Sequence, residues 1–191
     1  MTLKQAKILT DAQVKSILSH IADTRYPTRN KVMFLLSIKA GFRACEISGL
    51  KWSMVLNSAG AIGDTIELHD TAAKNKGGRL IPIHSKLKKA LIKHFKETPD
   101  CDYVITSERC VQMRASSIVN WFAKLYEQLG LNGCSSHSGR RTFIIKAART
   151  VHKVGGSLRD VQILAGHSSI DMTQRYIEGD TRTQQRLVGL L

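Results

Sequence analysis

Acidic residues are scarce in this chain. Its 191 residues include 15 Asp and Glu against 29 Lys and Arg, which gives a formal net charge of +14 and a pI near 9.9. Such an excess favours a polyanionic partner, most often a nucleic acid. A basic globular protein without such a partner is the alternative, and charge alone leaves both open.

Cysteine and long apolar runs are also scarce. The four cysteines form no C-x-x-C pair, so the sequence shows no zinc-ribbon pattern and no disulfide framework, and free thiols are expected. The N-terminus has no apolar signal region, and no apolar run approaches membrane-spanning length. These absences predict a cytoplasmic protein that does not associate with a membrane.

The first part of the chain has a helical pattern. Its length and 42% hydrophobic content suit one globular domain with a substantial core, and it contains no internal repeat. Thr10 and Gln13 form a capping-box pattern ahead of a helix over 11–22. Pro27 opens a second helix that ends near Gly41; because this helix is apolar nearly all round, it is expected at the centre of the fold.

The remainder predicts one hairpin and further helices. Residues 65–69 and 79–83 alternate as strands around a basic turn, and Pro82 confines the second strand to a sheet edge. The other expected elements are short helix 43–50, helix 86–97 capped by Ser85, a short strand at 103–106, a helix from Ser116 or Ser117 to Leu129, helix 138–154, a helix from the Ser157 cap to Gly166, one capped by Ser168 that carries Tyr176, and a final helix over 180–191. The predicted fold class is mainly α with a small antiparallel β-sheet (α+β).

Side chains suited to phosphate chemistry recur along the chain. They are Arg43, Lys74, His137, Arg140, His167 and Tyr176. A phosphodiester repels nucleophiles and gains negative charge in its transition state, which paired guanidinium groups can stabilise. A phenol has a pKa of about 10, so attack by Tyr176 would need nearby cations and a proton acceptor.

Each of these residues has an ordinary structural explanation when it is taken alone. Arg43 can form an ion pair with Glu46, a histidine can cap a helix, and Tyr176 can pack in a core. Two histidines also suggest a metal ion, but no third ligand has a suitable spacing, so no metal and no other cofactor is expected.

Their order resembles the tyrosine recombinases, the phage integrase family, over nearly the whole chain. The resemblance rests on Gly-Phe-Arg43-x-x-Glu46, His137-x-x-Arg140, Gly-His167 and a tyrosine nine residues later. It implies the catalytic-domain fold of DNA breaking-rejoining enzymes. It also implies that Arg43 and Arg140 grip the phosphate, Glu46 orients Arg43, His137 handles protons, and His167 donates a hydrogen bond to the phosphate.

The resemblance assigns the remaining roles as well. Tyr176 is the expected nucleophile, and Lys74 the general acid for the leaving 5′ oxygen, with Lys76 as the fallback. The implied function is site-specific recombination of double-stranded DNA, in integration, excision or inversion, through a 3′-phosphotyrosine. Four protomers would act on two DNA sites without ATP or divalent ions, and the tail after Tyr176 would dock on a neighbour or on its own chain.

Two features depart from the family pattern. Ser138-Gly139 stands where the family usually has Asp-Leu or similar, so the helix there is expected to begin later or more loosely, since glycine costs about 1 kcal/mol in a helix. Residues 1–191 are expected to be one catalytic domain without the separate N-terminal core-binding domain of most members. A type IB topoisomerase-like relaxase and an inactive DNA-binding module of the same fold remain alternatives.

Overall fold

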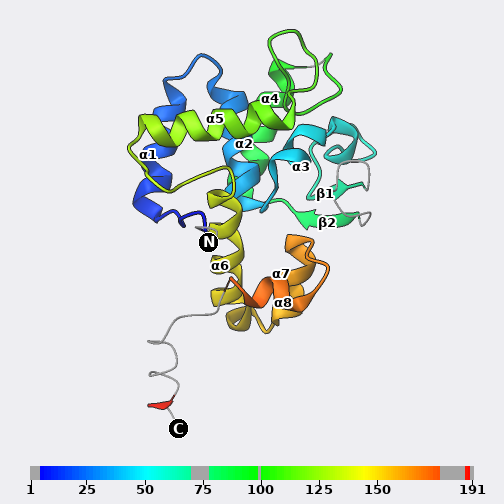
Figure 1. Cartoon of the computed structure of the whole chain (residues 1–191). Helices are drawn as coiled ribbons and strands as arrows, with labels where there is room; N and C mark the ends of the chain where they lie inside the picture. The colour runs from blue at the N-terminus through cyan, green and yellow to red at the C-terminus, as the bar shows by residue number, and fades with distance from the viewer. Residues whose placement is uncertain (1–4, 70–77, 99, 177–187, 190–191) are drawn as a thin grey trace.

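A computed structural model gives the fold of residues 5–69, 78–98, 100–176 and 188–189 (Figure 1). It is helical with one two-stranded sheet, as the sequence predicts. The elements in chain order are α1 (Asp11–Ala22), α2 (Pro27–Lys39), α3 (Ala44–Gly49), the 3-10 helix η1 (Trp52–Met54), β1 (Thr65–Leu68), β2 (Arg79–Pro82), α4 (Ser85–Glu97), α5 (Ala115–Gln128), α6 (Ser138–Thr150), the 3-10 helix η2 (Val151–Val154), α7 (Leu158–Ala165) and α8 (Ile170–Gln174).

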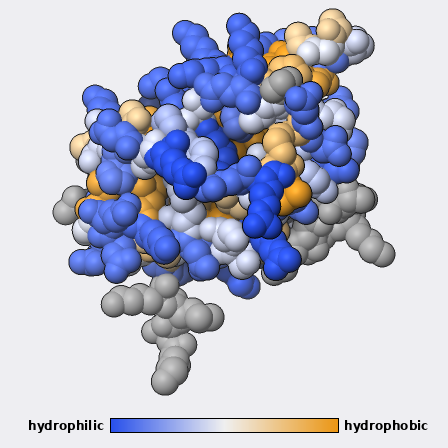
Figure 2. All heavy atoms as spheres, turned by 90° about the horizontal axis from the view of Figure 1, so that it is seen from above, coloured by the Kyte–Doolittle hydropathy of each residue, from blue (hydrophilic) through white to orange (hydrophobic). Residues whose placement is uncertain are grey.

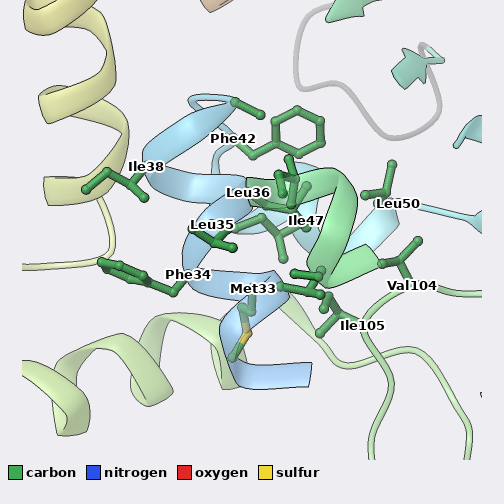
Figure 3. Packing of buried hydrophobic residues seen from close by; sticks show 14 of the residues in the cluster. Met33, Phe34, Leu35, Leu36, Ile38, Phe42, Ile47, Leu50, Val104 and Ile105 are labelled. Atoms are coloured by element: carbon green, nitrogen blue, oxygen red, sulfur yellow. The ribbon is translucent and has the colours of Figure 1, made fainter. Parts of the chain in front are cut away.

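Helix α2 lies at the centre of the larger hydrophobic core. Every residue from Val32 to Ile38 is buried, which agrees with its apolar sequence. Figure 3 shows the side chains of 33–36 and Ile38 packed in one cluster with Phe42, Ile47 and Leu50 from the segment that follows α2. Because α3 is fixed against this core, the residues at its start are held in a defined place.

A smaller core lies around the second half of α6. Ile144 and Ala148 of α6 pack with Val161 and Ala165 of α7, and Tyr176 packs against this group. In Figure 1, α7 and α8 lie beside α6 and below β2. The start of α6 contacts α2 and its later turns contact α7, so this helix joins the two cores.

The two strands form an antiparallel ladder. Thr65 pairs with Pro82 at one end, and Leu68 pairs with Arg79 at the other. Pro82 is the last residue of β2 in a two-stranded sheet, so the predicted edge position is confirmed. The turn that carries Lys74 and Lys76 lies outside the described residues.

The capping boxes at Thr10 and Ser157 are confirmed, but three other predicted helix starts are wrong. Helix α4 begins at Ser85 itself, and the Nδ1 of His84 accepts a hydrogen bond from the Lys86 backbone N–H at 3.1 Å. Helix α5 starts at Ala115, before either predicted serine cap. The cap of α8 is Ser169 rather than Ser168.

Two predicted helices differ at their C-terminal ends. Residues 138–154 form α6 only as far as Thr150 and then tighten into the 3-10 helix η2. Helix α8 ends at Gln174, so Tyr176 lies just beyond it. The helix predicted over 180–191 falls almost entirely outside the described residues.

The expectation of four free thiols is wrong. Cys101 and Cys110 form a disulfide bond, whereas Cys45 and Cys134 do not. The sequence offered no pairing motif. In the fold, a backbone bridge between Thr106 and Gln112 closes the loop that carries Cys110, and the Cα atoms of the two bonded cysteines lie 5.7 Å apart.

Hydrophilic residues cover most of the face seen in Figure 2, and hydrophobic atoms show between them. None of the helices in the described part of the chain combines the length and the apolar character that crossing a lipid bilayer requires.

Candidate active site

Arg140 lies where the two cores meet. Its side chain projects from the first turn of α6, and the residue is only 3% exposed. Its Nη1 donates to the Gly41 carbonyl at 2.6 Å, and its Nη2 donates to the Ala165 carbonyl at 2.7 Å. One guanidinium therefore joins the chain after α2 to the end of α7.

The carboxylate of Glu46 binds two further arginines. Arg43, just before α3, donates from its backbone N–H to Oε2 at 2.8 Å and from Nη1 to Oε1 at 3.0 Å. Arg79, the first residue of β2, donates from Nη1 to Oε1 at 2.8 Å and from Nη2 to Oε2 at 3.1 Å. The Glu46 side chain is fully buried, and these bonds satisfy both of its oxygens.

Arg79 is the residue of this site that the sequence did not reveal. Its Nε also donates to the Leu164 carbonyl at 3.1 Å, so it connects β2, α3 and α7. Its partner Glu46 is 33 positions away in the chain, and no local pattern predicts such a pairing. The only signal in the sequence is an arginine at the start of a predicted strand, and such an arginine does not by itself indicate a buried partner.

His167 is buried directly after the left-handed Gly166 that ends α7. Its Nδ1 lies 2.9 Å from the Thr173 hydroxyl, and its carbonyl accepts a hydrogen bond from the Gln162 side chain at 3.0 Å. Burial, followed by the charges of Arg140 and Arg43, lowers the pKa of His167 to about 4. The imidazole is therefore neutral at physiological pH.

Tyr176 stacks on His167. The ring centroids are 5.5 Å apart and the ring planes are inclined by 18°. Tyr176 also lines a cavity of about 400 Å³. The other residues around this cavity are Gln5, Ala6, Ser135, His137, Arg140, Arg141, Met172 and Arg175.

His137 occupies the N-cap position of α6 rather than its first turn. It lines the same cavity as Arg140. Helix α6 begins at Ser138, so the later or looser start predicted from Gly139 is wrong. A Cβ on Gly139 would collide with the hydroxyl oxygen of Ser37, which shows that this glycine lets α6 approach α2 closely.

The site carries more positive than negative charge. One carboxylate, that of Glu46, faces three guanidinium groups, those of Arg43, Arg79 and Arg140. Burial, followed by the charge of Arg43, lowers the pKa of Arg140 to about 10, so its guanidinium stays protonated at neutral pH. Burial alone would raise the pKa of Glu46, but the bonds and charges of Arg79 and Arg43 hold that pKa below its ordinary value.

This arrangement suits an anion with several oxygens. Guanidinium groups bind phosphate through paired, charge-assisted hydrogen bonds, and a site with surplus positive charge is stabilised when a phosphate enters it. Among the described residues, no group of three His, Cys, Asp or Glu side chains is placed to hold a metal ion. The structure thus brings five predicted site residues and Glu46 together, while Lys74 and Lys76 lie outside the residues it describes.

Residues 7–182 match the model of the Phage integrase family. The chain is 27% identical over 187 residues to the tyrosine recombinase XerD of Rickettsia conorii, with 91% of this chain and 60% of that protein covered. It is 32% identical over 175 residues to the tyrosine recombinase XerA of Thermococcus onnurineus, with 89% of this chain and 57% of that protein covered.

A solved structure of the Tn1549 transposon integrase in complex with transposon right end DNA superimposes on the chain with a TM-score of 0.78. The two sequences are 19% identical, and the match covers 97% of this chain and 66% of the integrase, so it establishes a shared fold. The chain spans about three fifths of the length of the curated relatives it matches.

Proposed function

The chain belongs to the phage integrase family, and on that premise we propose that it is the catalytic domain of a tyrosine-type, site-specific DNA recombinase. It would cleave and rejoin strands of double-stranded DNA through a covalent 3′-phosphotyrosine. The observation that carries the proposal is the position of Tyr176, stacked on His167 at the rim of a cavity that Arg140 also lines.

The phosphate-binding groups would be Arg43, Arg140 and His167. The two guanidinium groups carry permanent charge, and removing one preorganised donor of this kind typically lowers a rate by about 10²–10³-fold. We propose that the Thr173 hydroxyl donates to Nδ1 of His167, 2.9 Å away, which places the proton of the neutral imidazole on Nε2. His167 would then donate a hydrogen bond to the phosphate without adding a charge.

Tyr176 would be the nucleophile. Its phenolic oxygen forms a bond to phosphorus while the bond from phosphorus to the 5′ oxygen breaks. His137, on the same cavity, would take the phenolic proton, and Lys74 would protonate the leaving 5′ oxygen, with Lys76 as the alternative donor. The role of each lysine stays a prediction from the family resemblance.

Rejoining would reverse this chemistry with a new strand. A 5′-hydroxyl from the partner strand attacks the phosphotyrosine and releases the phenol. Because one phosphoester replaces another, the cycle consumes no ATP, and we propose that it requires no divalent ion. Incubation with EDTA tests that statement, since the rate of covalent capture should not change.

The proposed partners are DNA and further copies of the protein. The net charge of +14 suits a polyanion. By family resemblance, four protomers would act on two sites, and the segment after Tyr176 would dock on a neighbour, in a cytoplasmic protein associated with a mobile element. We also propose that residues 1–191 form one domain.

Covalent capture on nicked DNA tests the proposal. Nicked duplexes tiled across the DNA that flanks the coding sequence lose the short fragment after cleavage, so the enzyme stays attached. Wild-type protein should form a complex that resists denaturant, whereas Tyr176→Phe should bind the same duplex without forming it. Capture by Tyr176→Phe at the wild-type rate would exclude Tyr176 as the nucleophile.

The two alternatives are separated by other readouts. A type IB topoisomerase-like enzyme would relax any supercoiled plasmid, whereas a recombinase should act mainly on plasmids that carry its site. An inactive DNA-binding module would bind every duplex without covalent capture. The comparisons do not favour these alternatives, because the relatives described above are recombinases and an integrase.

A further inference from the structure

The carboxylate of Glu46 is shared unequally between two arginines. Arg79 contacts both oxygens through its two terminal nitrogens, Nη1 and Nη2, in an end-on, bidentate pair. The guanidinium of Arg43 contacts only Oε1, through Nη1. Among the described residues, the Nε and Nη2 of Arg43 make no hydrogen bond, and its side chain is 18% exposed, whereas that of Arg79 is 6% exposed.

We propose that Arg79 is a positioning residue that keeps the guanidinium of Arg43 available for the phosphate by occupying both oxygens of Glu46. This inference rests on the proposed function, since it concerns the phosphate-binding role of Arg43. A carboxylate can accept one bidentate arginine in its plane. While Arg79 holds that position, the guanidinium of Arg43 is bonded to Glu46 through Nη1 alone, so its Nε and Nη2 can donate to another anion.

The surroundings of Arg79 fix it in this role. Its Nε is bound to the Leu164 carbonyl, and its guanidinium lies over the ring of Phe42 at 5.6 Å from the centroid. A Cβ on Gly166 would lie 2.7 Å from its Nη1, so the glycine before His167 leaves room for the guanidinium. Arg79 therefore holds the segment that carries His167 and the segment that carries Arg43 against one carboxylate.

Loss of Arg79 should misdirect Arg43 rather than merely loosen the fold. Glu46 would remain buried, and Arg43 would be its only ion-pair partner among the residues described here. The Arg43 guanidinium would then turn to form the bidentate pair itself and withdraw its remaining donors from the phosphate. Displacement of a catalytic group by about 1 Å can cost about 100-fold in rate, so the effect should appear in the chemical step.

The test combines Arg79→Met with Glu46→Gln. Single-turnover capture on nicked duplex is measured at saturating DNA, with the dissociation constant measured separately. Arg79→Met should slow capture by about 10- to 100-fold and change the dissociation constant by less than about 3-fold. The double variant should capture faster than Arg79→Met, because a neutral amide no longer attracts Arg43 strongly.

If Arg79 only stabilises the fold, the double variant should capture DNA more slowly than Arg79→Met, because the loss of a second buried partner should destabilise the site further. The inference is therefore overturned if the double variant is as slow as Arg79→Met, or if Arg79→Met matches wild type. Arg25→Met, which breaks the exposed ion pair with Glu108, is the matched control and should keep the wild-type rate. Circular dichroism checks that each variant is folded.

Two further results are informative. If Arg79→Met does not fold, Arg79→Lys replaces it, because an ammonium keeps the charge but cannot form the bidentate pair. The same rescue by Glu46→Gln is then expected, and its absence overturns the inference. If the wild-type protein binds duplex DNA but captures none, the proposed function fails, and this inference fails with it. If the wild-type protein captures DNA normally but Glu46→Gln does not restore the rate, only the role of Arg79 is rejected.

Discussion

Tyr176 lies against His167 with the two rings nearly parallel, 5.5 Å between centroids. This stack holds the phenol beside the cavity in the protein without DNA. His167 thus has two neighbours from the segment after α7: the ring of Tyr176, and the hydroxyl of Thr173, which lies 2.9 Å from its Nδ1. The segment that carries the proposed nucleophile is therefore packed on the site rather than projecting from it.

The stack predicts different stabilities for two variants of Tyr176. Tyr176→Phe keeps the ring and should change the free energy of unfolding by less than about 0.5 kcal/mol. Tyr176→Ala removes the aromatic pair and should cost about 0.5–1.5 kcal/mol beyond its lost area. Urea unfolding measures both, and equal stability of Tyr176→Ala and wild type would show that the stack is not populated in solution.

Arg140→Lys should impair both folding and chemistry. A lysine ammonium cannot reproduce the two bonds to the Gly41 and Ala165 carbonyls, so stability should fall by about 1–3 kcal/mol. Covalent capture should slow by about 10²–10³-fold. The control is Arg109→Lys at an exposed position, which should change neither quantity. Wild-type capture by Arg140→Lys would remove Arg140 from the phosphate site.

Gly139→Ala should destabilise the protein although alanine favours helices. Its Cβ would meet the Ser37 hydroxyl, and overpacking of this kind costs about 1–3 kcal/mol, more than the gain of about 1 kcal/mol in helix propensity. The Ser37 hydroxyl makes no hydrogen bond within the described residues, so Ser37→Ala should be nearly neutral. The double variant should therefore recover part of the loss, since the Ser37 Cβ would still lie 3.0 Å from the new methyl group, and additive losses would refute the close contact.

The low pKa of His167 predicts how stability depends on pH. Between its ordinary pKa of 6.5 and its folded pKa of about 4, the unfolded chain binds a proton that the folded protein does not, so stability falls as pH decreases. From pH 7 to pH 5 this contributes a loss of about 2 kcal/mol. His167→Gln should lose less stability than wild type over the same pH range, whereas His152→Gln, at an exposed position, should lose as much as wild type. If the free energy of unfolding depends on pH identically in His167→Gln and wild type, the low pKa is contradicted.

Local patterns predicted most of the helices, because their determinants lie within a few residues. The boxes at Thr10 and Ser157, and the apolar run of α2, needed no distant partner. The wrong caps at Ser85 and Ser116 have a common origin. Serine in those positions is compatible with a cap, but the extended residues that precede the helices are His84 and Arg114, so α4 begins one residue and α5 two residues before the predicted start.

The site was predicted through the order of its residues, and its supporting contacts were not. Arg43 and His167 stood out by resemblance, whereas Arg79 acts through a carboxylate and a carbonyl from distant segments. The contact between Gly139 and Ser37 is equally invisible in the sequence, since it depends on the distance between α2 and α6. Pairings of this kind become evident only when the elements are packed.

The central claim is that the phenolic oxygen of Tyr176 becomes bonded to a DNA 3′-phosphate. The most direct measurement is mass spectrometry of the captured complex after digestion with nuclease and protease. One modified peptide should carry a 3′-phosphonucleotide on Tyr176, and the released strand should have a free 5′-hydroxyl. A nucleotide on another residue, or a 5′-linked adduct, would contradict the central claim.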